Sequence, residues 1–138
     1  NSNNDELINK LKELNIYENV VLHGLLEPSK VHDLFAKSDI SLLLSKFGES
    51  FPNVLAESMI YGTLPISTNI GDSAFILDKF GYLLREDDDA LKIAKIINHY
   101  SLLKKNDYER WKKIILSCQK FSKERFSISK IAYSFNNL

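Results

Sequence analysis

Hydrophobic positions follow two alternating patterns along this chain, one typical of amphipathic helices and one typical of buried strands. Apolar residues at helical spacing predict helices over residues 5–15, 28–37, 52–61, 72–78, 88–104, 106–121 and 124–135. Short, largely apolar runs predict strands at 19–23, 40–44, 64–68 and 82–84. The run at 40–44 is too continuous to be apolar on one face only, which is typical of a parallel sheet that is covered on both sides.

Residues with strong positional preferences support these boundaries. Pro28 fits the first turn of a helix, where the missing N–H costs nothing, and Gly62 fits a helix C-cap. Pro65 lies near the start of its strand, as strands require. Asn106 and Glu109 have the spacing of a capping box and predict the start of the second long C-terminal helix.

The order of the elements predicts the fold class. Parallel neighbours need helical crossovers, so strands that alternate with helices predict an α/β fold. We expect a Rossmann-like doubly wound parallel sheet with helices at the C-terminal end. The chain has 138 residues, enough for one domain over 1–138. It begins on a helix, which is unusual for such a sheet and indicates a fragment.

Charge and cysteine content narrow the function classes. Eighteen basic residues balance eighteen acidic ones, so we expect no nucleic-acid partner. Residues 1–100 carry a net charge of −6 and residues 101–138 one of +6. Solvated lysine-rich helix faces are the simpler explanation, and attraction to an anionic membrane surface or a partner domain is the alternative. One cysteine, Cys118, excludes a disulfide scaffold and fits a reducing compartment.

No apolar run in the sequence approaches the roughly 20 residues that span a bilayer, and the polar start is not a signal peptide. We therefore expect a cytoplasmic protein. The uneven distribution of charge along the chain suggests a location at the inner face of the membrane as an alternative.

Candidate chemistry lies in the loops that follow the strands, because ligands of open α/β sheets bind at the carboxyl ends. Residues 45–51 form the richest of these loops and contain Gly48 and Glu49. The unpaired N–H groups of the helix that follows, near Asn53 and Val54, would form an anion site. Glu57 follows Asn53 by one helical turn on the same face.

This arrangement suits a nucleoside diphosphate sugar. A carboxylate at Glu57 could accept hydrogen bonds from both hydroxyls of a ribose, and Glu49 could meet a second polyol. The anion site between them would take the pyrophosphate. From spacing alone, however, two ordinary solvent-exposed acids explain the pattern better.

A longer stretch of sequence favours the nucleotide-sugar site over two ordinary exposed acids. The segment Gly48-Glu49-Ser50-Phe51-Pro52-Asn53-Val54-Leu55-Ala56-Glu57-Ser58-Met59, followed by Gly62, Pro65 and Gly71, resembles the two-glutamate signature of group-1 retaining glycosyltransferases of GT-B fold. The resemblance extends over about residues 5–135 and includes Asp39–Ser45, His23-Gly24 and Phe80–Leu84. It corresponds to the donor-binding C-terminal half of such an enzyme.

The resemblance implies a role for each matching position. Glu49 resembles the glutamate beside the donor sugar and the reaction centre, and Glu57 the one that holds the ribose. Gly24 resembles a glycine at the donor cleft, with His23 beside it. The stretch whose backbone amides meet sugar hydroxyls and phosphates corresponds to Phe51, Pro52, Asn53 and Val54. The implied donor is a UDP-, GDP- or ADP-linked sugar, with retention of configuration and without metal or other cofactor.

The sequence also departs from the family pattern. Leu44 stands where the family usually has proline, and Ser58 where alanine often follows the second glutamate. The preceding strand, the basic pair that neutralises the leaving diphosphate and the acceptor-binding N-terminal domain are missing. We therefore expect catalysis only in the full-length enzyme, of which this chain would be the donor-binding half. The expected reaction is sugar transfer to a glycan or lipid-linked acceptor in bacterial surface polysaccharide synthesis.

Other polar groups have simpler explanations. Asp87-Asp88-Asp89 contains an Asp-x-Asp metal motif, but it precedes a helix, so capping and solvation explain it better. His32 and His99 are interpreted as surface helix residues. Trp111, Ile114, Ile115 and Cys118 recur at helical spacing and predict core positions.

Two other functions remain open at this point. One is a nucleotide-sugar epimerase of related architecture. The other is a non-catalytic module that binds a nucleotide or a protein partner.

Overall fold

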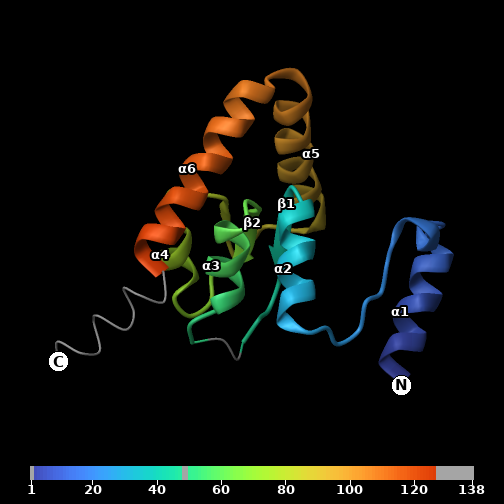
Figure 1. The fold of residues 1–138 in the computed structure, drawn as a ribbon. Helices are drawn as coiled ribbons and strands as arrows, with labels where there is room; N and C mark the ends of the chain where they lie inside the picture. The colour runs from blue at the N-terminus through green and yellow to red at the C-terminus, as the bar shows by residue number, and fades with distance from the viewer. Residues whose placement is uncertain (1, 48–49, 127–138) are drawn as a thin grey trace.

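The computed structural model describes residues 2–47 and 50–126 and has a mixed α/β fold (Figure 1). Three parallel strands and six α-helices make up the described part, together with one short 3-10 helix. The elements are α1 (Ser2–Glu13), η1 (Tyr17–Asn19), α2 (Pro28–Lys37), β1 (Ile40–Leu43), α3 (Asn53–Ile60), β2 (Leu64–Thr68), α4 (Ser73–Leu77), β3 (Tyr82–Leu84), α5 (Ala90–Asn106) and α6 (Tyr108–Phe126).

The sheet has the strand order β1-β2-β3, and both pairs of neighbours are parallel. Ile40 lies opposite Leu64, and Ile66 lies opposite Tyr82. Each connection between neighbouring strands contains a helix, as parallel pairing requires. The predicted Rossmann-like α/β class is therefore confirmed.

Helices cover both faces of the sheet. On one face α3, α4 and α6 contribute to an apolar cluster that contains Leu55, Met59, Ile76 and Cys118. On the other face α5 packs against β2 and β3 through the buried residues of a second cluster, Ile66, Leu84 and Ile96. The central strand β2 is buried along nearly all of its length because both faces are covered.

The strand predicted at 19–23 is wrong. Asn19 ends the 3-10 helix η1, and the residues after it are extended but pair with no strand of the described sheet. Val21 is 73% exposed, which is incompatible with a buried strand. Extended backbone becomes a strand only when a neighbour accepts its hydrogen bonds, and this segment lies beyond α2, away from β1 (Figure 1).

Three smaller expectations also change. Leu42 is 48% exposed, so the edge strand β1 is covered less completely than its apolar sequence predicts. Asp107, rather than Asn106, caps α6: its Oδ1 accepts the Arg110 backbone N–H at 3.1 Å. Helix α6 continues to Phe126 without the predicted break near 121, and residues 127–135 of the last predicted helix lie outside the described residues.

Among the described residues, no helix is both long enough and apolar enough to cross a membrane.

Candidate functional site

The loop between β1 and α3 is tied at its start to the end of β2 and at its end to the turn before α4 (Ser73–Leu77). At its start the Thr68 hydroxyl, at the end of β2, donates to the carbonyl oxygen of Ser45 at 2.6 Å. Near its end the Asp72 backbone N–H donates to the carbonyl oxygen of Ser50 at 2.9 Å. These bonds hold the loop at the carboxyl ends of β1 and β2, where open α/β sheets bind ligands. Gly48 and Glu49 belong to this loop but lie outside the described residues.

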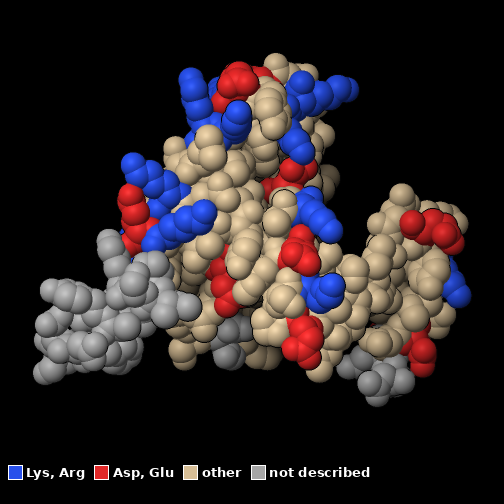
Figure 2. Space-filling model, viewed as in Figure 1, with Lys and Arg blue, Asp and Glu red and all other residues tan. Residues whose placement is uncertain are grey.

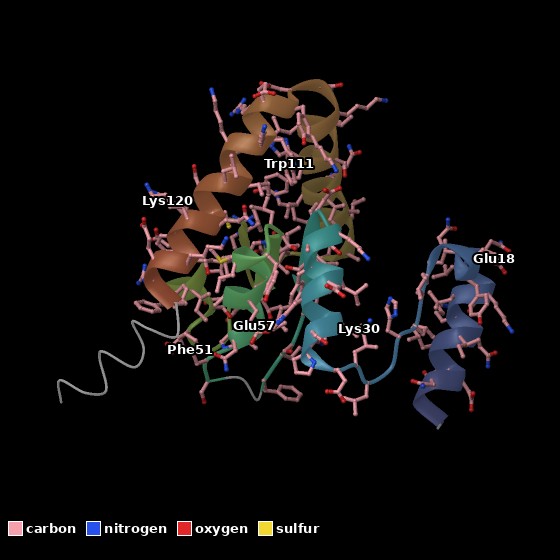
Figure 3. All side chains as sticks on the ribbon, in the orientation of Figure 1. Glu18, Lys30, Phe51, Glu57, Trp111 and Lys120 are labelled. Atoms are coloured by element: carbon pink, nitrogen blue, oxygen red, sulfur yellow. The ribbon has the colours of Figure 1, made fainter. Side chains whose placement is uncertain are left out.

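Glu57 lies on the side of α3 that faces α2 (Figure 3). Its carboxylate Oε2 is 3.5 Å from Nε2 of His32 on α2, and its side chain is 45% exposed. The other ring nitrogen of His32, Nδ1, is 3.1 Å from the hydroxyl of Tyr61. The His32 and Tyr61 rings are stacked with their centroids 4.5 Å apart. His32 therefore contacts Glu57 on one side and is itself contacted by Tyr61, while the other side of Glu57 faces solvent.

The Glu57 carboxylate favours one tautomer of the neutral His32 ring. A lone pair on Nε2 would be repelled by the negative carboxylate oxygen, so the tautomer with its proton on Nε2 is preferred. In the neutral ring Nδ1 is then the acceptor, and the Tyr61 hydroxyl donates to it. His32 lies on a helix with a partly exposed side chain, as expected, but its contacts with Glu57 and Tyr61 are not evident from the sequence. Sequence reasoning missed them because Glu57 lies 25 positions away on another helix.

The start of α3 contains the remaining loop candidates. Pro52 is buried and precedes the first helical residue, while Phe51, Asn53 and Val54 are exposed. The Asn53 N–H donates to the Phe51 carbonyl at 2.9 Å, so it is not one of the free amides that the sequence predicts. The Val54 N–H has no acceptor within the described residues. One amide of the expected anion site thus remains available in the first turn of α3.

Phe51 belongs to an aromatic group at the same end of the molecule (Figure 3). Its ring contacts that of Phe126 on α6 edge-on, with the centroids 6.1 Å apart. The Arg125 guanidinium lies 3.9 Å from the centroid of Phe75, in the first turn of α4. The C-terminal turn of α6 therefore borders the loop that carries the candidate site.

His23 and Gly24 are not brought together with the other candidates. Both are exposed, and α2 lies between their segment and α3 in Figure 1. Gly24 has a φ of +65° with open space where a Cβ would be. Among the described residues no hydrogen bond joins either of them to α3. Their place at the donor cleft stays a prediction.

The run of three aspartates has local structural roles, as the sequence predicted. Asp88 accepts the Arg85 backbone N–H at 2.9 Å, and this bond holds the pKa of its carboxyl below the ordinary value. Asp89 accepts the Lys92 N–H at 2.8 Å and caps α5. Within residues 2–47 and 50–126, no three His, Cys, Asp or Glu side chains cluster in a way that could hold a metal ion.

The one cysteine is part of the core. Cys118 is 1% exposed, and burial raises the pKa of its thiol to about 12. A thiol in this state is not a nucleophile at neutral pH. Trp111 is also buried, as expected, while Ile114 and Ile115 are half-buried.

Comparison with protein families gives one match that covers most of the chain. Residues 1–117 match the model of the family described as glycosyl transferases group 1. The chain belongs to this family. Glycosyl transfer is therefore the general activity to which the site must be related. Comparison with individually curated proteins gives no match.

The match of this group 1 glycosyl transferase includes the whole sheet and α3. It confirms the resemblance found in the sequence. Ser58, one of the departures from the family pattern, is fully buried, and its hydroxyl donates to the Leu55 carbonyl at 2.8 Å. A serine fits here because it is small and its one polar group is satisfied within the helix.

Proposed function

We propose that residues 1–138 are the donor-binding C-terminal domain of a retaining glycosyltransferase that uses a nucleotide sugar. The observation that carries this proposal is the position of Glu57. Its carboxylate lies one helical turn beyond the Val54 N–H, which has no acceptor among residues 2–47 and 50–126, at the carboxyl end of a parallel sheet. A diol acceptor next to an anion site suits a ribose followed by a diphosphate.

In this proposal each group of the donor has its own partner. Glu57 accepts hydrogen bonds from the ribose hydroxyls on its solvent side, while His32 keeps the carboxylate in place from the other side. The diphosphate lies at the start of α3, against the Val54 N–H and the backbone of Phe51 to Asn53. Glu49 stands beside the sugar, where charge develops at the anomeric carbon. No metal or other cofactor takes part.

The acceptor and the cellular role are further parts of the proposal. The acceptor would bind an N-terminal domain of the same full-length enzyme, which transfers a hexose to a glycan or a lipid-linked acceptor. The lysine-, isoleucine- and asparagine-rich composition, common in surface-polysaccharide gene clusters, supports a bacterial enzyme of that pathway class. A cytoplasmic location at the inner face of the membrane would suit such an acceptor.

Steady-state kinetics of the full-length enzyme test the two glutamates separately. Glu57→Gln should mainly raise KM for the donor, because the ribose contact is the same in the ground and transition states. Glu49→Gln should mainly lower kcat, on the order of a hundredfold, because it removes a charge that stabilises the transition state. Glu86→Gln, at an exposed acid outside the site, serves as the control and should leave both constants unchanged.

Two outcomes would contradict the proposal. If Glu49→Gln turned over normally and Glu57→Gln only lowered the melting temperature, the two acids would be structural. If calorimetric titration of the folded protein with UDP, GDP and ADP gave no saturating heat, the domain would not be a nucleotide site. Conversion of a nucleotide sugar to its epimer without an acceptor would instead indicate the epimerase.

A further inference from the structure

Two hollows lie side by side near the junction of β3, α5 and α6, and both are lined by cationic side chains. One has a volume of about 430 Å³ and is lined in part by Lys79, Arg110 and Lys113. The other has a volume of about 350 Å³ and is lined in part by Lys92 and Lys95, together with His99. The side chain of Tyr100 lines both hollows, so they meet at this residue. We call the two hollows together the cationic groove.

Most of these charges have no acid beside them among the residues that line the groove. Neither hollow has an Asp or Glu among its described lining residues. None of the five lysine and arginine side chains takes part in an ion pair within the described part of the chain. Asp88 at the start of α5 is the exception, because its carboxylate attracts Lys92 at one edge of the groove. The other four like charges repel one another, and an anionic ligand would relieve that repulsion.

The groove lies away from the candidate donor site. Leu64, the first residue of β2, and Gly81, which directly precedes β3, line the larger hollow. The donor site lies at the other ends of these strands, so both sites can be occupied together. Figure 2 shows further Lys and Arg side chains over α6 and the tip of the α5–α6 hairpin. The positive charge of the C-terminal residues is thus concentrated on the helices that border the groove.

The lining favours one kind of anion. Besides the cations, apolar side chains line the larger hollow, including Leu64, Phe80 and Ile114. Such a lining suits the glycerol and first methylene groups that follow a lipid phosphate. Single-stranded nucleic acids, in contrast, are bound largely by stacking of their bases on exposed aromatic rings. The aromatic side chains of the groove, Phe80, Tyr82 and Tyr100, are half-buried.

We propose that the cationic groove docks this protein on an anionic phospholipid bilayer, with headgroup phosphates in the two hollows. A bilayer presents many phosphates at once, so it can occupy both hollows, whereas one free phosphate fills only one. Each Lys or Arg near an anionic surface strengthens attachment about fivefold, and salt weakens it. This surface is independent of the donor site, and its test needs no nucleotide sugar.

The test is sedimentation of the purified protein with lipid vesicles. Vesicles of phosphatidylcholine and phosphatidylglycerol in equal amounts should bind the protein at low salt and release it at about 0.5 M NaCl. Vesicles of phosphatidylcholine alone should not bind it. The variant Lys79→Gln, Lys95→Gln, Lys113→Gln should weaken binding on the order of a hundredfold. These three side chains are exposed, and circular dichroism melts check that the variant folds.

A second triple variant with the same change in net charge is the matched control. Lys10→Gln, Lys30→Gln, Lys123→Gln alters three exposed lysines outside the groove and should keep most of the vesicle binding. Equal losses in both variants would overturn the groove and leave only a general charge effect. Absence of binding by the folded wild-type protein would also overturn it. So would displacement by inorganic phosphate at constant ionic strength, or equally strong binding of a single-stranded RNA.

Discussion

Two glycines with nearly the same backbone conformation provide a sharp test of the packing around β3. Gly81 has a φ of +70° and Gly24 a φ of +65°, a region that L-residues rarely adopt. Alanine at either position costs about 1–2 kcal/mol for the conformation alone. At Gly24 nothing lies within 4 Å of an added Cβ. At Gly81 the added Cβ would overlap the carbonyl oxygen of Pro65 and lie 3.0 Å from its Cγ.

The two substitutions should therefore differ by the cost of the overlap. Pro65 is fully buried in the central strand, so relief requires β3 to move away from β2 and the Tyr100 hydroxyl to lose its 3.3 Å bond to the Gly81 carbonyl. Overpacking of this kind adds about 1–3 kcal/mol, which gives roughly 4 kcal/mol in total for Gly81→Ala.

Urea unfolding followed by far-ultraviolet circular dichroism measures both variants. With a slope near 2 kcal/mol per molar, Gly81→Ala should move the midpoint down by about 2 M, and Gly24→Ala by about 0.5–1 M. Equal midpoints for the two variants would refute the reasoning, because the conformational cost is common to both and only the overlap separates them.

Three further outcomes follow from the site and the core. In the full-length enzyme His32→Ala should raise the donor KM about fivefold with little change in kcat. His32→Gln, whose amide can donate to Glu57, should bring the donor KM part of the way back to the wild-type value. An unchanged KM in His32→Ala would show that His32 does not belong to the site. Cys118, with a pKa of about 12, should stay unmodified by iodoacetamide at pH 8, where about one thiol in ten thousand is ionised, and react once urea unfolds the chain. Donor binding should persist in EDTA, and a strict need for magnesium or manganese would contradict the proposed site.

Local sequence predicted those elements whose boundaries depend on local chemistry. Pro28 is the first residue of α2, as expected, because its fixed φ and missing N–H suit the first helical position. The strand at 64–68 is confirmed, and its residues are buried along nearly all of its length, as a strand covered on both faces requires. The strand predicted at 19–23 is wrong because it has no partner in the described sheet. Val20 and Val21 favour extended backbone, but whether the segment pairs depends on a neighbouring strand that its own sequence does not specify.

The candidate site shows the same division between local and distant information. Glu57 could be found because it lies one helical turn from the first residue of its own helix. His32 could not, because its contact with Glu57 depends on how α2 packs against α3. The pairing of the Asn53 N–H with Phe51 was also missed, since the turn before α3 depends on how the buried Pro52 packs. The role of Glu49 remains a prediction.

The buried position of Cys118 makes this protein a convenient host for site-specific labels. It is the one cysteine of the sequence, and the core shields it from reagents while the protein is folded. A cysteine introduced at an exposed position, such as Glu86 or Lys95, would therefore be the single reactive thiol under native conditions. A fluorophore or spin label could be attached there without replacing the native residue. The wild-type protein, carried through the same labelling reaction, would measure the background directly.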